Sequence, residues 1–106
     1  MAEPIPLRMS VASIQRLIRS RAGASEAVII TDHAQERMEE RSFTIDDVLT
    51  ILRLGGVYCA PLRNEKGDWQ ADVERRMPGG RDAVAVTIVP HGQMLIVRTI
   101  MWRDER

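Results

Sequence analysis

The residues best suited to chemistry lie in one short segment, 33–41, whose composition predicts a helix. On a helix His33, Arg37 and Arg41 are spaced four residues apart, so their side chains lie along one face. This face would combine an imidazole that titrates near neutral pH with two permanent cations. The amides at the start of the helix would add to the attraction for an anion. The pattern therefore indicates a site for an anionic ligand, with proton transfer available at the imidazole.

Acidic residues in the same segment allow a second interpretation of this helix. Glu36, Glu39 and Glu40 are close to the two arginines and would form ordinary surface ion pairs, each worth about 0.3 kcal/mol. His33 would then serve only to begin the helix or to pack against its neighbours. Helix spacing taken alone favours this structural interpretation.

A second polar cluster is expected on one face of a strand. Residues 69–77 alternate between apolar and polar side chains, as a strand with one buried face does. The polar face would carry Gln70, Asp72, Glu74 and Arg76, with Arg75, Arg81 and Arg98 on neighbouring segments. Such a face would hold an RNA backbone, although a face turned to water is the ordinary outcome for an antiparallel sheet.

The spacings typical of other sites do not occur. The two histidines are far apart in the sequence, and the short His and Cys spacings of metal sites do not occur, so neither a metal nor a cofactor is expected. Phosphate-binding loops and hydrolase motifs do not occur either. Cys59 is expected to be a small buried hydrophobe. The aromatic residues are too scattered to stack on bases and are expected in the core or at its rim: Phe43, Tyr58, Trp69 and Trp102.

The composition describes a folded chain of one domain, 1–106, because 44% of the residues are hydrophobic and 28% are charged. The net charge is zero, so overall electrostatics do not indicate a nucleic-acid binder. Fourteen of the fifteen basic residues are arginine, which fits either phosphate recognition or a compositional bias. No apolar run is long enough for a membrane helix or a secretory signal, and a cytoplasmic protein without a membrane partner is expected.

The first part of the chain is expected to be mainly helical over 10–56, after a flexible arm over 1–9. Polar capping residues and apolar residues at helical spacing predict three helices, over 10–23, 31–41 and 44–55. A short apolar run at 27–30 has the composition of an edge strand.

From residue 57 the hydrophobic period changes from about 3.6 to 2, which predicts a sheet over 57–104. Strands are expected over 57–62, 69–77, 83–89 and 93–102. Their short connections predict an antiparallel meander, because parallel strands would need long crossovers. The fold class is therefore α+β, with two to three N-terminal helices packed on one face of this meander.

Two parts of the sequence resemble known proteins, and together they cover about residues 10–104. The segment HAQERMEER at 33–41 resembles small bacterial domains of unassigned function that carry an HA-x-x-R-M-x-x-R helix. The second half is similar to the MqsR toxins, mRNA interferases of the RelE-like group. The similarity consists of WQADV at 69–73, a Gly-containing turn, and apolar strands over 84–89 and 95–97.

This resemblance implies a toxin-like, metal-independent endoribonuclease that cuts mRNA and is held inactive by a cognate antitoxin protein. Gln70 is the position at which a toxin site residue carries over. The toxins' lysines and tyrosine are missing, so His33 would be the general acid or base. Arg37, Arg41 and Arg98 would then stabilise charge on the phosphate attacked by the RNA 2′-OH.

The alternative is a non-catalytic RelE-like module that binds a protein partner or RNA. In that case Arg37 and Arg41 would clamp the chain's own carboxylates or its sheet. Direct DNA binding is not expected, because the sequence has no DNA-reading helix.

Overall fold

The computed structural model describes residues 9–105, which form three α-helices packed on one six-stranded sheet. The helices are α1 (Val11–Ala22), α2 (Asp32–Arg41) and α3 (Ile45–Leu54). The strands are β1 (Val28–Ile30), β2 (Gly56–Val57), β3 (Leu62–Arg63), β4 (Trp69–Arg76), β5 (Asp82–Val89) and β6 (Leu95–Trp102). Two 3-10 turns, η1 (Ser25–Ala27) and η2 (Arg103–Glu105), complete the fold. The predicted α+β class is confirmed.

Each helix begins at the polar residue predicted to cap it. The side chains of Ser10, Thr31 and Thr44 accept hydrogen bonds from main-chain N–H groups three residues further on. At Thr44 the bond is reciprocal, because the Asp47 carboxylate accepts from the Thr44 N–H at 2.9 Å. These caps satisfy amides that have no partner within the helix, and they fix where each helix starts.

The predicted antiparallel meander is confirmed for β4, β5 and β6, whereas the sheet as a whole is mixed. The strand order is β1-β6-β5-β4-β2, with β3 also paired to β4, and β1 runs parallel to β6. The edge strand suggested at 27–30 is β1, and its partner β6 follows only after the chain has passed through α2, α3 and the strands β2 to β5. The strand predicted over 57–62 is wrong. It is divided into β2 and β3, because Pro61 has no N–H to donate to a ladder.

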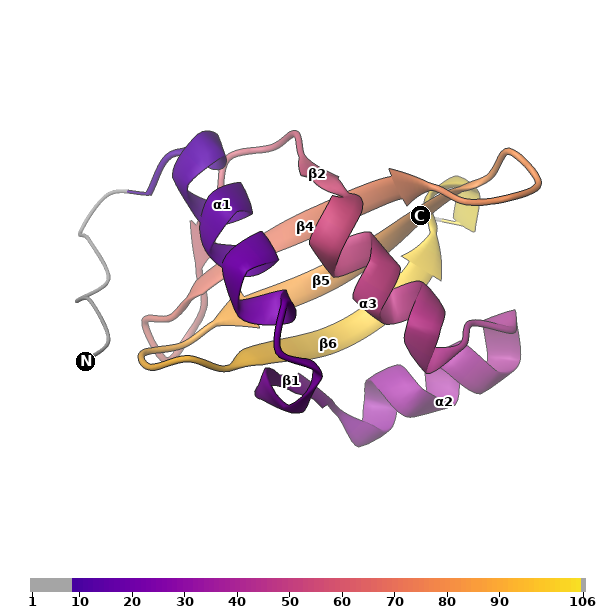
Figure 1. The fold of residues 1–106 in the computed structure, drawn as a ribbon, viewed down its shortest axis with the longest axis horizontal. Coiled ribbons are helices and arrows are strands. Elements are labelled where there is room, and N and C mark those ends of the chain that lie inside the picture. Colours follow the sequence, from indigo (N-terminus) through magenta and orange to yellow (C-terminus); the bar gives the residue numbers. More distant parts are fainter. Residues whose placement is uncertain (1–8, 106) are drawn as a thin grey trace.

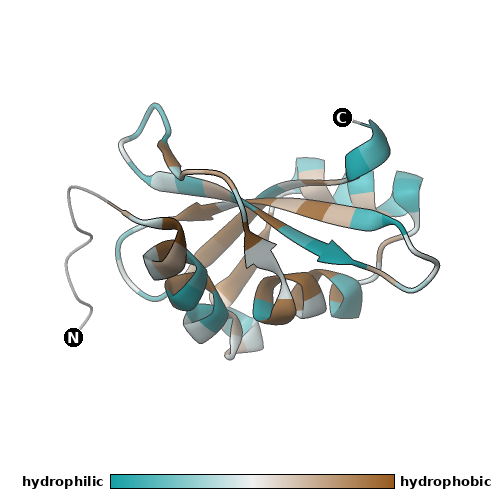
Figure 2. Cartoon of the chain, turned by 90° about the horizontal axis from the view of Figure 1, so that it is seen from above, coloured by the Kyte–Doolittle hydropathy of each residue, from teal (hydrophilic) through white to brown (hydrophobic). Residues whose placement is uncertain are grey.

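The helices lie on the sheet in two positions (Figure 1). Helices α1 and α3 cover one face, whereas α2 runs alongside β6 and continues the edge that β1 begins. Apolar residues of all three helices meet the strands in one core, which the hydropathy colouring shows between the layers (Figure 2). The largest fully buried helical residues are Ile14, Ile18, Val48, Ile51 and Leu52. The second face of the sheet is turned away from α1 and α3.

The segment between β2 and β3 corrects two further expectations. Tyr58 is 72% exposed, not part of the core, and Cys59 is exposed, not buried. Both residues leave the sheet at the point where the predicted strand is interrupted. The arm predicted over 1–9 lies outside the described residues except for Met9, which packs against the core. Between residues 9 and 105, no helix has the length and apolar character needed to cross a bilayer.

Candidate functional site

Two of the predicted helix residues lie on the surface of α2. His33 is exposed in the first turn, two residues after the capping Thr31. Arg37 is partly exposed and pairs with Glu40 at 2.5 Å, three residues further along the same helix. The ion pair considered in the structural interpretation is therefore present for Arg37.

Arg41 and Thr31 attach α2 to the edge of β6. The Thr31 N–H donates to the Val97 carbonyl at 3.2 Å, and its hydroxyl donates to the Arg98 carbonyl at 3.1 Å. At the other end of the helix, Arg41 Nη1 donates to the Ile100 carbonyl at 3.4 Å. Helix α2 thus supplies donors to β6 where β1 has ended, which protects a sheet edge. Arg41 also pairs with a carboxylate of η2, at 3.3 Å.

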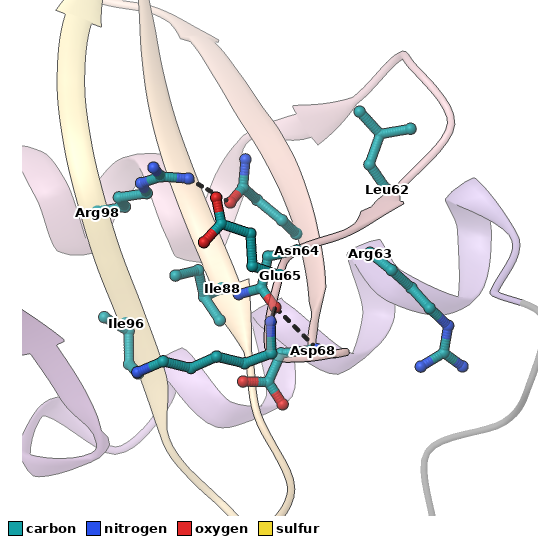
Figure 3. A pocket seen from close by; sticks show the side chains of 10 residues that line it. Leu62, Arg63, Asn64, Glu65, Asp68, Ile88, Ile96 and Arg98 are labelled. Carbon is teal, nitrogen blue, oxygen red and sulfur yellow. Dashed lines mark hydrogen bonds between the residues drawn. The ribbon is translucent and has the colours of Figure 1, made fainter.

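The other two predicted residues come together on the open face of the sheet. Arg98 Nη1 donates to Gln70 Oε1 at 3.1 Å, and both side chains line a depression of about 500 Å³ (Figure 3). The depression is lined by Leu62, Arg63, Asn64, Glu65, Lys66, Asp68, Gln70, Ile88, Ile96 and Arg98. His33, Arg37 and Arg41 do not line it. The structure therefore divides the five predicted site residues into two groups.

A β-bulge directs Arg98 toward Gln70. Val97 is paired with Thr87 and Thr99 with Val86, so Arg98 is an extra residue with no partner on β5. A bulge of this kind turns a side chain out of the regular alternation. The guanidinium of β6 can then reach across β5 to an amide on β4, two strands away.

A second contact of the same kind crosses β5 nearby. Arg103 Nη1 donates to Glu74 Oε1, again from the β6 side of the sheet to β4. Val84 and Val86 lie between these partners on β5 and are 0% and 8% exposed, although α1 and α3 cover the opposite face. We infer that the two arginine side chains cover this apolar strip with their stems.

An apolar row crosses the open face beside Arg98. The strand registers place one residue of each of five strands side by side: Leu62, Gln70, Ile88, Ile96 and Ile29. The two ends of the row are well exposed, at 69% for Leu62 and 45% for Ile29. The row forms an apolar floor that a single amide interrupts, next to a cation.

The turn between β3 and β4 forms the outer wall of the depression. The Asn64 side-chain oxygen accepts from the main-chain N–H groups of Lys66 and Asp68, both at 3.0 Å. The Arg63 guanidinium stacks on the Trp69 ring at 4.4 Å, and it points away from the depression in Figure 3. These contacts hold the wall in one shape, which favours a preformed binding site.

The lining of the depression offers hydrogen-bond donors and acceptors. Arg98 retains N–H groups beyond the one given to Gln70, and Lys66 adds a second cation. No histidine is among the lining residues. Throughout residues 9–105, no three His, Cys, Asp or Glu side chains are grouped as a metal ion would require. The arrangement is suited to binding and orienting a polar ligand.

Five residues that line the depression were not predicted as site residues: Ile88, Ile96 and the charged turn residues Glu65, Lys66 and Asp68. The sequence did contain one indication that the two isoleucines lie on an apolar face. Residues 83–89 are apolar on both faces of the predicted strand, except at Thr87. A strand with apolar residues on both faces cannot have one face that is simply polar. The position of the turn against this floor has no local signal, since it follows from the pairing of β3 with β4.

Comparison of the chain with family models, curated proteins and solved structures finds no match.

Proposed function

We propose that this protein is a non-catalytic module that binds single-stranded RNA on the open face of its sheet. The observation that carries the proposal is the meeting of Gln70 and Arg98 at 3.1 Å in a preformed depression. Both residues were candidates from the sequence alone. Guanidinium groups bind phosphate oxygens and base edges, and single strands present both of these.

The contacts of α2 support binding in preference to cleavage. Cutting RNA through its 2′-OH needs a base and an acid within hydrogen-bond reach of the reacting oxygens. Arg37 and Arg41, proposed to stabilise the phosphate, are held by Glu40 and by a carbonyl of β6. Neither they nor His33 line the depression. An RNA on the open face would therefore meet Arg98 without meeting this set of groups.

A toxin-like, metal-independent endoribonuclease with a cognate antitoxin is the second candidate. The start of α2 supports it, because Thr31 is bonded to the main chain at Val97 and Arg98. His33 is exposed two residues after Thr31, on the face of α2 that also carries Arg37. In this candidate His33 exchanges the proton and Gln70 orients the phosphate.

Binding of a short, fluorescently labelled single-stranded RNA, followed by anisotropy, tests the first candidate. We expect Arg98→Gln to weaken binding about tenfold, because it removes the cation in the depression. The matched control is Arg41→Gln, which removes a cation of α2 and should leave the affinity of the folded protein unchanged. Absence of RNA binding by the parent protein, or an equal loss in both variants, would overturn the proposal.

Cleavage is tested on the same RNA, together with growth of cells that express the protein. The first candidate predicts intact RNA and normal growth. RNA cleavage or growth arrest that disappears in His33→Ala, with RNA binding retained, would establish the endoribonuclease in its place. Rescue of growth by a co-expressed neighbouring gene product would then identify the antitoxin.

A further inference from the structure

The depression carries carboxylates as well as cations, and this mixture limits what can bind there. Glu65 and Asp68 line it together with Lys66 and Arg98. Figure 3 shows the Glu65 and Asp68 carboxylates on the same side of the sheet as the Arg98 guanidinium. A bare phosphate would be repelled by two carboxylates within one small site. A ligand with hydrogen-bond donors as well as acceptors, and with a flat apolar body, matches the lining better.

We propose that the depression binds one unstacked guanine base of a single-stranded RNA, an inference that rests on the proposed RNA-binding function. The base would lie on Ile88 and Ile96, which are paired neighbours on β5 and β6. Its O6 and N7 atoms would accept from Arg98, which is the commonest specific contact to guanine. Its N1–H and N2–H groups would donate to the Glu65 or Asp68 carboxylate.

The other three bases match this lining less well. A guanidinium pairs best with two adjacent acceptors and a carboxylate with two adjacent donors. Guanine carries both pairs, whereas adenine and cytosine have one amino group beside ring acceptors, and uracil has a single ring N–H between two carbonyls. Each of those bases would leave either the arginine or a carboxylate without its second partner, at a cost in affinity.

Contacts within the protein hold the recognising groups in place. Gln70 Oε1 accepts from Arg98, which orients the guanidinium and leaves the Gln70 amide N–H groups as further donors toward the base. On the other side, Asn64 fixes the main chain at Lys66 and Asp68 through its two 3.0 Å hydrogen bonds. A site whose groups are already oriented loses less entropy when a ligand binds.

The test compares short oligouridine RNAs that differ at one central position, which is guanine, adenine or uracil. We expect the guanine RNA to bind roughly tenfold more tightly than the other two, as one bidentate pair provides. Equal affinity for all three RNAs would overturn the guanine assignment and leave the proposed function standing. No binding of any of them would overturn both.

Carboxylate variants identify the discriminating groups. Glu65→Gln combined with Asp68→Asn should remove the preference for guanine, so that the guanine and uridine RNAs bind with equal affinity. Glu39→Gln, an exposed carboxylate on α2, is the matched control and should keep the preference. Glu65→Gln alone serves if the double variant unfolds at a lower temperature. Full retention of the guanine preference in the folded carboxylate variants would overturn the assignment.

Discussion

The helix-covered side and the open face of the sheet use arginine in different ways. On the helix side three arginines donate to main-chain carbonyls: Arg19 to Gly55 at 2.7 Å, Arg21 to Pro90 and Met94 at 2.7 and 2.8 Å, and Arg53 to Ala22 at 2.6 Å. On the open face Arg98 and Arg103 donate to side chains of β4. The arginines of the helix side join segments that are far apart in the sequence, whereas the side chains of Arg98 and Arg103 lie over β5.

This difference separates arginines that serve the fold from arginines that can meet a ligand. Arg21 is 7% exposed and its two carbonyl partners leave little of it for anything else. The side chain of Arg103 is 60% exposed, and Arg98 is exposed as well. The high arginine content therefore does not indicate phosphate recognition by itself. Arg19, Arg21 and Arg53 fix loops and helix ends, and the RNA proposal depends on the open face alone.

The largest effect is expected from Arg21→Met, which breaks a contact of the helix side. Burial lowers the pKa of this guanidinium, which nevertheless stays protonated. The substitution removes two charge-assisted hydrogen bonds and leaves two carbonyls of the β5–β6 turn without this donor. We expect the free energy of unfolding to fall by about 3 kcal/mol. Denaturation by urea, analysed by linear extrapolation, measures the change.

Arg16→Met is the control for this prediction. Arg16 lies on the same helix, five residues before Arg21, and is exposed. Its replacement should change the free energy of unfolding by no more than about 0.5 kcal/mol. A similar loss in both variants would mean that the carbonyl contacts of Arg21 contribute little, and the distinction between the two faces would fail.

A smaller effect is expected from Arg103→Leu on the open face. The substitution leaves the Glu74 carboxylate, 9% exposed, without its cation. Because Arg103 itself is largely in water, we expect a loss of about 2 kcal/mol at neutral pH, less than for a fully buried pair. Thermal or urea unfolding measures the loss, and Arg76→Leu, at an exposed ion pair of the same face, should cost much less.

The double variant Arg103→Leu with Glu74→Leu sharpens the comparison between the faces. Both partners on the open face are side chains, so both can be replaced by apolar groups, and stability should largely return. No second substitution can do the same for Arg21, because its partners are main-chain carbonyls. A double variant as unstable as Arg103→Leu alone would show that the loss does not come from the unpaired carboxylate.

The predictions that succeeded from sequence were those set by neighbouring residues. Ser10, Thr31 and Thr44 fix the helix starts through contacts only three residues long, so their polar side chains were sufficient evidence. The alternation over 69–77 likewise predicted which side chains of β4 face the helices. Gln70 and Arg98 were also candidates from the sequence; the structure shows that their side chains meet, and their role in a site stays a prediction.

The predictions that failed concern features that depend on residues far away in the chain. Whether β1 pairs with β6, and in which direction, is decided by residues about 70 positions apart in the sequence. No residue type in the sequence marks the bulge at Arg98, although this bulge determines whether the guanidinium reaches Gln70. For the same reason helix spacing could group His33, Arg37 and Arg41 but could not show that β6 would accept a bond from Arg41.

The smallest effect is expected at the surface pair between Arg81 and Asp104, and it concerns pH. The Arg81 guanidinium donates to the Asp104 carboxylate at 2.7 Å, and this hydrogen bond holds the pKa of the carboxyl below its usual value of 3.8. A carboxylate whose pKa is lower in the folded state stabilises the fold at higher pH. That stabilisation is lost as the pH falls through the folded pKa.

Asp104→Asn should therefore make the fall in stability between neutral and acid pH, the acid limb, less steep, because it lowers stability slightly at neutral pH and leaves stability near pH 2 unchanged. Unfolding by urea from pH 5 down to about pH 2 measures the limb. Arg81→Gln should flatten it in the same way, and the two substitutions together should do no more than either alone, because they remove one interaction. An unchanged limb in both single variants would mean that this pair, like many exposed pairs, contributes nothing measurable. The arginines that stabilise the fold would then be those bonded to main-chain carbonyls and to Glu74.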